Sequence, residues 1–341
     1  MSQQHYAASE KFCKRMNNFY RSLQAIVALG LTWALGPQAT FAQEAPLPKT
    51  MRMVIPFAPG ASNDVFGRAL AQRLGPRIGT NIVVENKPGA GGAIGAADVV
   101  RSAPDGSTLL FTSSAIATNA AIQRNLPYDP LSDVAPVALV ARSGLILVVN
   151  NDTPYKTVPQ LLQAMRDPNN RISYGSSGVG SVNHVATELL HSMAGTSAQH
   201  VAYKGISAVM VDLLGGRLQV LLSTVASARG QLQAGQLRPL AVSSLTRSKF
   251  NPELPPIADF VPGYSAEVWW GVFVTGKTPR SMIDRLNSEI RAVTMIPEMQ
   301  ELFAREAAES SPLTASQFRD HFVAEVGVWR KVANERKISA D

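Results

Sequence analysis

The sequence predicts an α/β protein of two similar lobes, each a sheet with helices on both faces, with a cleft between the lobes. Short apolar runs alternate with segments whose apolar residues recur at helical spacing, which is the pattern of parallel β-α-β units. The pattern restarts after residue 137, so two comparable halves follow one another. A chain of 341 residues is long enough for two hydrophobic cores.

The first half is predicted to contain strands at residues 51–55, 81–85 and 108–112. Between the first two strands, one apolar helix face is formed by Val65, Phe66, Ala69, Leu70 and Leu74. Residues 95–101 give a smaller alanine-rich helix, and the proline-containing stretch 125–130 indicates a long irregular connection.

The second half continues the alternation. Its expected strands are residues 145–149, 171–174, 200–203, 218–222, 239–243 and 269–274. Its expected helices are residues 158–165, 182–193, 207–214, 229–233, 279–294 and 315–336. The restart favours two sheets with a cleft over one large sheet.

Residues 1–42 have the order of a secretory signal. Lys11, Lys14, Arg15 and Arg21 precede the apolar run 23–35, and small residues follow it up to Ala42, where we expect cleavage. The apolar run is shorter than the roughly 20 residues that span a bilayer, so an uncleaved membrane anchor is the less favoured alternative. The rest of the chain is expected to be soluble outside the cytoplasm.

Composition excludes several classes of site. The only cysteine, Cys13, lies in the signal segment, so an internal disulfide and a cysteine-built metal centre are excluded. The five histidines have no metal-ligand spacing, and we expect neither a metal nor another cofactor. The net charge of +7 includes the basic residues of the signal, and no Lys/Arg block remains, so nucleic acid is not an expected partner.

Two loops combine a strand end with a helix start. Residues 56–64 carry prolines, Gly60 and three good N-cap types, and residues 174–184 carry three glycines and three serines. Unpaired N–H groups at a helix start suit an anion, so both loops are candidates for binding one. The alternatives are an ordinary capped turn for the first loop and a flexible linker for the second.

Enzyme motifs are mostly absent. Gly60 lacks the Gly-Lys-Ser/Thr of a nucleotide loop, and Val179 stands where the second glycine of G-x-S-x-G would be. A secreted hydrolase would need Ser177 or Ser181 with His184 as its base. His184 lies one helical turn before Glu188, but a capping or packing histidine is the more ordinary interpretation. We therefore do not expect an enzyme.

Five segments in order resemble a known family: residues 56–64, 84–92, 104–109, 174–181 and 203–205. They are similar to the tripartite tricarboxylate transporter receptors, also called Bug solute-binding proteins, over nearly the whole chain after the signal. The resemblance implies a monomeric periplasmic binding protein of the Venus flytrap, type II-like class. Such a protein closes around a small carboxylate and delivers it to a membrane permease; a sensory receptor for a membrane kinase remains the alternative.

The resemblance also implies where the ligand binds. The expected ligand-binding residues are Phe57, Ala58, Gly60, Ala61, Ser62, Asp64, Thr112, Ser113, Ser114, Ser176, Ser177, Gly178, Gly180, Ser181, His184, Tyr203 and Lys204. The family usually has a second glycine where this chain has Ala61, whose Cβ narrows the approach to the backbone. We expect domain one at residues 43–143 plus 266–341, domain two at 144–265, and hinges near Ser143-Gly144 and near residues 264–269.

Overall fold

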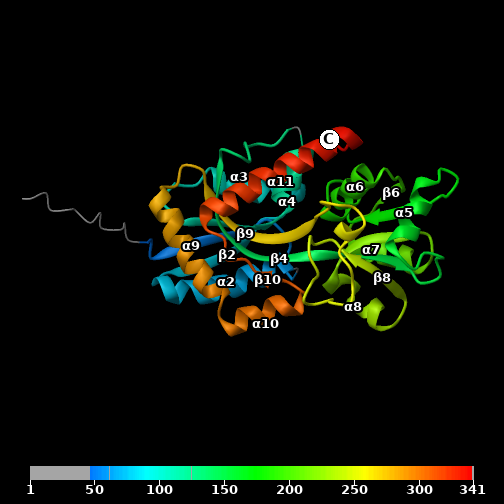
Figure 1. Cartoon of the computed structure of the whole chain (residues 1–341). Coiled ribbons are helices and arrows are strands. Elements are labelled where there is room, and N and C mark those ends of the chain that lie inside the picture. The colour runs from blue at the N-terminus through cyan, green and yellow to red at the C-terminus, as the bar shows by residue number, and fades with distance from the viewer. Residues whose placement is uncertain (1–46, 61, 124, 340–341) are drawn as a thin grey trace, which may run out of the picture. The chain divides into compact units, whose positions relative to one another are not determined.

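The computed structural model describes residues 47–60, 62–123 and 125–339 (Figure 1). The predicted signal segment 1–42 and Ala61 lie outside the described residues. Within the described part of the chain, no helix is both long enough and apolar enough to cross a membrane.

The elements up to the long strand β4 begin with three parallel strands and the helices between them. They are β1 (Thr50–Ile55), α2 (Ser62–Ile78), β2 (Asn81–Asn86), the 3-10 turn η2 (Ala90–Gly92), α3 (Ala93–Val100), β3 (Thr108–Ser113), α4 (Ala115–Ile122) and β4 (Val134–Asn150). Strand β1 pairs in parallel with both β2 and β3. Three of these elements are the strands that the sequence predicts at the start of the chain.

After β4, helices and strands continue to alternate up to β9. They are α5 (Val158–Arg166), β5 (Ser173–Ser176), α6 (Val182–Ala194), β6 (Gln199–Ala202), α7 (Ile206–Leu214), β7 (Val220–Thr224), α8 (Val225–Gln233), β8 (Leu237–Val242), η3 (Ile257–Asp259) and β9 (Glu267–Thr275). The chain then adds α9 (Arg280–Thr294), α10 (Pro297–Arg305), β10 (Glu309–Ser310) and α11 (Ala315–Arg336).

Strand β4 belongs to two sheets. Up to Gly144 it pairs with β9 and, at residues 141–142, with β10; together with β1, β2 and β3 these strands form the first sheet. From Leu145 onward β4 pairs with β7 and β8, which with β5 and β6 form the second sheet. The expected two sheets are therefore joined through one shared strand, and Figure 1 shows β4 and β9 running between the two groups of helices.

The aromatic core shows which helices cover which face of the first sheet. Trp269 and Trp270 are adjacent on β9, so their side chains point to opposite faces. Trp270 packs edge-on against Phe66 of α2, with ring centroids 4.8 Å apart. Trp269 packs edge-on against Phe318 of α11 at 5.4 Å. Helix α2 thus covers one face and α11 the other, which confirms helices on both faces of this sheet.

Several features were not expected from the sequence. Strand β4 starts eleven residues earlier than the predicted strand 145–149, and helices α4 and α10 were not predicted. The sequence of α4 is apolar nearly all round, and six of its eight residues are buried, so it shows no helical periodicity. Helix α10 begins at a proline in its first turn and is only nine residues long.

Candidate ligand-binding site

Asp64 holds the first candidate loop in shape. The Gly60 amide donates to Asp64 Oδ2 at 3.1 Å, while Arg68 Nε and Asn86 Nδ2 donate to Oδ1 at 2.8 and 2.9 Å. Burial by itself would raise the pKa of Asp64, but the hydrogen bonds from Arg68, Asn86 and Gly60 together lower it. Both oxygens of this buried carboxylate are therefore engaged by protein donors, and the role that the structure supports for Asp64 is to organise the loop.

The other members of the first loop are more accessible. Phe57 is half-buried and its carbonyl accepts a hydrogen bond from Asn86 Nδ2 at 3.0 Å, whereas Ala58 and Gly60 are exposed. Ser62 Oγ donates to Glu306 at 2.9 Å, which ties the start of α2 to the end of α10. Gly60 is therefore exposed at the turn, while Phe57 and Ser62 on either side of it are held by hydrogen bonds.

The carboxyl end of β3 brings a second group of predicted residues beside the first loop. Thr112, Ser113 and Ser114 are all buried, and Ser114 directly precedes α4. The Ser114 amide donates to the Trp269 carbonyl at 2.9 Å, but the Ser114 hydroxyl has no hydrogen-bond partner. A buried hydroxyl without a partner is costly, so it is a candidate donor to a ligand.

The second candidate loop is tied together by its own serines. Ser176 Oγ accepts from the Gly178 amide at 3.2 Å and lies 2.7 Å from His200 Nε2. Ser181 Oγ donates to the Gly178 carbonyl at 2.7 Å, and Ser177 Oγ donates to Asn183 Oδ1 at 3.0 Å. The loop is therefore an ordered turn rather than a linker.

His184 accepts a hydrogen bond from the backbone of the same loop. Its Nδ1 accepts a hydrogen bond from the Gly180 amide at 3.0 Å, and the side chain is buried. In the described part of the chain, no hydrogen bond joins His184 to either serine of the hydrolase alternative, because Ser177 and Ser181 donate elsewhere. The histidine thus acts as a cap, as its position near the start of α6 allows.

A buried polar cluster supports the second loop. The rings of His184 and His200 stack with centroids 3.9 Å apart, and Tyr174 stacks on His200 at 4.9 Å. The Tyr174 hydroxyl donates to Glu188 Oε1 at 2.6 Å, and Arg336 Nε of α11 donates to Glu188 Oε2 at 2.5 Å. The charges of Glu188 and Arg336 are thereby paired with each other.

Tyr203 lies next to the second loop. The Tyr203 amide donates to the Ser176 carbonyl at 3.0 Å, and its hydroxyl donates to Asp212 at 2.5 Å. Lys204 is exposed. The predicted residues of the second sheet thus gather around β5 and the start of α6.

Helix α4 and the turn η2 connect the two loops. A Cβ on Gly92 of η2 would lie 3.5 Å from the Phe57 ring, and Asn119 of α4 donates to the Gly91 carbonyl at 2.7 Å. About one turn further along α4, a Cβ on Gly180 would lie 1.7 Å from Ile122 Cδ1. The two loops therefore contact the same short bridge of chain, although no hydrogen bond between described residues joins them directly.

Ser223 is a candidate that the sequence analysis missed. It is fully buried at the carboxyl end of β7, and its hydroxyl has no hydrogen-bond partner, as for Ser114. The following residue, Thr224, is the N-cap of α8 and accepts from the Ser227 amide at 3.2 Å. The signal was present in the sequence, since Ser223-Thr224 repeat the order of strand, hydroxyl residue and helix.

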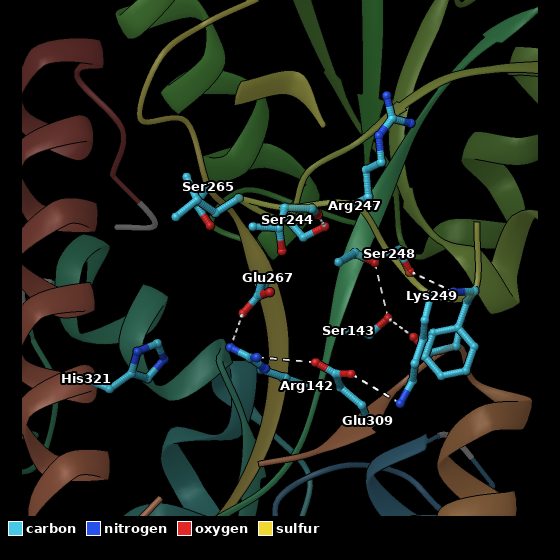
Figure 2. Close-up of a pocket in the computed structure, with 15 residues that line it drawn as sticks. Arg142, Ser143, Ser244, Arg247, Ser248, Lys249, Ser265, Glu267, Glu309 and His321 are labelled. Carbon is cyan, nitrogen blue, oxygen red and sulfur yellow. Dashed lines mark hydrogen bonds and ion pairs between the residues drawn. The ribbon is translucent and has the colours of Figure 1, made fainter. Parts of the chain in front are cut away.

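A cavity of about 380 Å³ lies where the strands pass from one sheet to the other (Figure 2). None of the predicted ligand-binding residues lines it. Glu309 lies between two cations, 3.3 Å from Arg142 and 3.3 Å from Lys249, and Arg142 also approaches Glu267 at 3.8 Å. The charges of these four residues largely compensate one another. Arg247 also lines the cavity, and its guanidinium donates to the carbonyls of Pro252 and Leu254.

Ser243 ties the two crossing segments together near this cavity. Its buried hydroxyl accepts from the Leu145 amide at 2.7 Å and donates to the Ala266 carbonyl at 2.5 Å. The Ala266 amide in turn donates to the Ser243 carbonyl at 3.0 Å. A single side chain therefore links β4, where its pairing partners change, to the segment that leads into β9.

Within the described residues, no group of three or more His, Cys, Asp or Glu side chains is arranged to hold a metal ion.

The model of the tripartite tricarboxylate transporter family receptor matches residues 66–338. A protein in the tcbD-tcbE intergenic region of Pseudomonas sp. strain P51 is 32% identical over 92% of this chain and 95% of its own length. Protein BugT of Bordetella pertussis is 31% identical over 84% of this chain and 89% of its own.

Solved structures show the same fold. R. palustris Rpa4515 with adipate has a TM-score of 0.73 and 31% identity, covering 86% of this chain and 99% of its own. The periplasmic binding protein BugD has a TM-score of 0.70 and 27% identity, covering 85% of this chain and 98% of its own. The two-lobed α/β architecture that the sequence predicts is confirmed by these similarities.

Proposed function

Because the chain belongs to the tripartite tricarboxylate transporter receptor family, whose members are periplasmic solute-binding proteins, we propose that it captures a small carboxylate between its two lobes and delivers it to a membrane permease. The ligand would lie among the loops that follow β1, β3, β5 and β7, since ligands of open α/β sheets bind beyond the carboxyl ends of the strands. The signal at residues 1–42 would export the protein to the periplasm, where it would act as a monomer.

The observation that carries this proposal is a pair of buried serine hydroxyls without partners, Ser114 and Ser223. Ser114 directly follows β3 of the first sheet and is the N-cap of α4. Ser223 is the last but one residue of β7 in the second sheet and directly precedes the N-cap of α8. A carboxylate would accept charge-assisted hydrogen bonds from both hydroxyls, and these bonds are stronger than those between neutral groups. Contacts from both sheets would favour the closed form in proportion to the difference in affinity between the two forms.

We propose domain one as residues 43–143 plus 266–341 and domain two as residues 144–265. The pairing partners of β4 change between Gly144 and Leu145, which supports a hinge at this point. The segment just before β9 is the second crossing, and the Ser243 hydroxyl links the two. Closure would then consist of a rotation about these crossings while each sheet stays intact.

A thermal-shift screen of the protein without its signal tests the binding proposal. The panel contains mono-, di- and tricarboxylates, amino acids and aromatic acids, and it begins with adipate because that ligand accompanies the similar R. palustris structure. We expect at least one carboxylate to raise the melting temperature, because a ligand that binds only the folded state stabilises it.

Two serine variants then test the site, with titration calorimetry as the measurement. Ser114→Ala and Ser223→Ala should each weaken binding of the identified carboxylate by roughly 10-fold, the value of one hydrogen bond to a charged group. Stability without ligand should stay the same or rise, because neither hydroxyl has a partner to lose. Ser244→Ala is the control, since that exposed hydroxyl donates to the Thr246 carbonyl outside the proposed loops. Unchanged affinity in both Ser114 and Ser223 variants would contradict the site.

Delivery to a permease is tested separately in cells. Uptake of the identified carboxylate should fall in a strain that lacks the gene, and the unmodified protein should restore it. Uptake that is unchanged, together with a lost transcriptional response to the same carboxylate, would favour the sensory alternative. Hydrolysis of ester substrates by the purified protein would contradict the expectation that it is not an enzyme.

A further inference from the structure

The hydrogen bond from the Gly180 amide fixes the protonation state of the His184 ring. The amide nitrogen can only donate, and it lies 3.0 Å from His184 Nδ1, so this ring nitrogen must carry a lone pair. A neutral ring then has its proton on Nε2. A protonated ring has a hydrogen on both nitrogens. Its Nδ1–H would then face the Gly180 N–H, and the two donors would repel each other.

We propose that His184 is a positioning residue that holds the second loop in its binding shape by accepting the Gly180 amide hydrogen, and that protonation of its ring releases the loop and weakens ligand binding. This inference rests on the proposed function, because it assigns a control to the same site. His184 itself contacts the loop from behind, so it acts on the ligand only through residues 176–181.

The surroundings of the ring keep it neutral at physiological pH. His200 of β6 stacks on it at 3.9 Å and Tyr174 of β5 at 6.3 Å. Among the described residues, the carboxylate that acts on the ring is Glu188 of the same helix, and it is engaged by Tyr174 and by Arg336 of α11. His191, one turn beyond Glu188, contacts Tyr174 edge-on. Burial, reinforced by His200, lowers the pKa of His184 to about 4.

The sign of the effect follows from this pKa. The folded protein prefers the neutral ring, while an unfolded chain takes up the proton near the ordinary pKa of 6.5. The stabilising contribution of the neutral ring is therefore complete above pH 6.5, and it is lost as the pH falls towards about 4. Below that range the Gly180 amide loses its acceptor.

Loss of the hydrogen bond between the Gly180 amide and His184 would affect the first lobe through the contact of Gly180 with Ile122. Gly180 is buried and packs against Ile122 at the end of α4, with no space for even a Cβ between them. A shift of Gly180 towards Ile122 would therefore press on α4, which also holds the turn η2 through Asn119. Loss of the His184 acceptor would thus disturb the residues that connect the two candidate loops.

The first test needs no ligand. NMR of the imidazole nitrogens in the unliganded protein should show a neutral His184 ring with the proton on Nε2, titrating near pH 4. Hydrogen exchange of the Gly180 amide should be slow in the unmodified protein and in His184→Asn, whose side-chain oxygen can accept the same hydrogen without titrating. Exchange should be at least about 10-fold faster in His184→Leu, which keeps the bulk but has no acceptor.

The second test measures affinity for the carboxylate found in the screen, from pH 7 to pH 4. At pH 7, His184→Leu should bind roughly 10-fold more weakly and His184→Asn within about 3-fold of the unmodified protein. On acidification the unmodified protein should lose more affinity than His184→Asn. Protonation of the ligand affects both proteins equally, so it cancels in the difference between them.

Two results would overturn the inference. One is a Gly180 amide that is as well protected in His184→Leu as in the unmodified protein; if that variant does not fold, a Gly180 amide whose exchange is unaffected by titration of the ring has the same meaning. The other is an equal loss of affinity on acidification in the Asn variant. If no carboxylate binds any form of the protein, the proposed function fails, and the NMR experiment still decides whether His184 positions the loop.

Discussion

Replacement of Gly180 by alanine tests the contact between the second loop and α4. Gly180 has a φ of +76°, and a Cβ at this position would lie 1.7 Å from Ile122 Cδ1 and 3.1 Å from its Cγ1. Ile122 is itself buried, so it cannot turn into solvent. Gly180→Ala therefore introduces backbone strain and an overpacked contact at once.

Both costs can be given a magnitude. A side chain in the left-handed region costs about 1–2 kcal/mol. Forcing one extra carbon into a filled contact costs about 1–3 kcal/mol. We expect Gly180→Ala to lower the free energy of unfolding by about 2–5 kcal/mol, which is a large part of the stability of a typical domain.

A second substitution separates the two costs. Ile122→Val removes the Cδ1 methyl and should cost about 0.5–1.5 kcal/mol on its own. In the double variant the overpacked contact is relieved, so the combined loss should be smaller than the sum of the single losses by about 1–3 kcal/mol. Gly235→Ala is the matched control for strain alone, because Gly235 has a φ of +67° and no atom lies within 4 Å of its Cβ position.

Urea denaturation followed by circular dichroism measures all four variants. The strain control should lose only about 1–2 kcal/mol. Additive losses in the Gly180/Ile122 pair, or a Gly180→Ala loss no larger than that of Gly235→Ala, would mean that the loop does not press against α4. The bridge between the two candidate loops would then have to be abandoned.

Two further predictions concern the crossing segments and α11. Ser243→Ala leaves a buried amide and a buried carbonyl without a partner and should destabilise the protein by about 2–4 kcal/mol in urea denaturation, whereas Ser244→Ala, at a half-buried residue, should stay within about 0.5 kcal/mol. Burial raises the pKa of Glu325 to about 7, although Trp269 and Trp329 donate to it at 2.5 and 3.0 Å. The stability from this group is complete below about pH 4.5 and lost as the pH rises through 7, so tryptophan fluorescence should titrate near pH 7 in the unmodified protein and not in Glu325→Gln.

Local periodicity predicted most of the strands and helices, and it failed where an element lacks one clear pattern. The apolar run that became β4 is interrupted by Arg142 and Ser143, which in sequence resembles the end of a strand. In the structure the strand continues, because Arg142 reaches Glu267 and Glu309 beside the cavity while the backbone keeps its pairing with β9. The charged residue marks the passage between two sheets, which only the pairing partners of β4 reveal.

The candidate site was predictable as a set of loops, because Gly, Ser and Pro at strand ends are visible in sequence. The partners of individual groups were not. Ser114 and Ser223 are distinguished from the other serines by burial without a hydrogen bond, which depends on atoms far away in the chain. Ser223 was missed for a simpler reason, since one serine and one threonine after a strand are a weak signal without glycines nearby.

The hydrogen bonds of the loops suggest a different role for the glycine amides from the one that the sequence indicates. The sequence favours glycine amides as the donors for an anion, yet three of these amides donate within the protein: Gly60 to Asp64, Gly178 to Ser176 and Gly180 to His184. These bonds fix the loops before a ligand arrives, which lowers the entropy cost of binding. Under the proposed function, the glycine amides would serve preorganisation and the free hydroxyls of Ser114 and Ser223 would make the contact with the carboxylate. Substitutions at the two kinds of position should then differ, since losing an amide acceptor would affect stability and binding together, and losing a hydroxyl would affect binding alone.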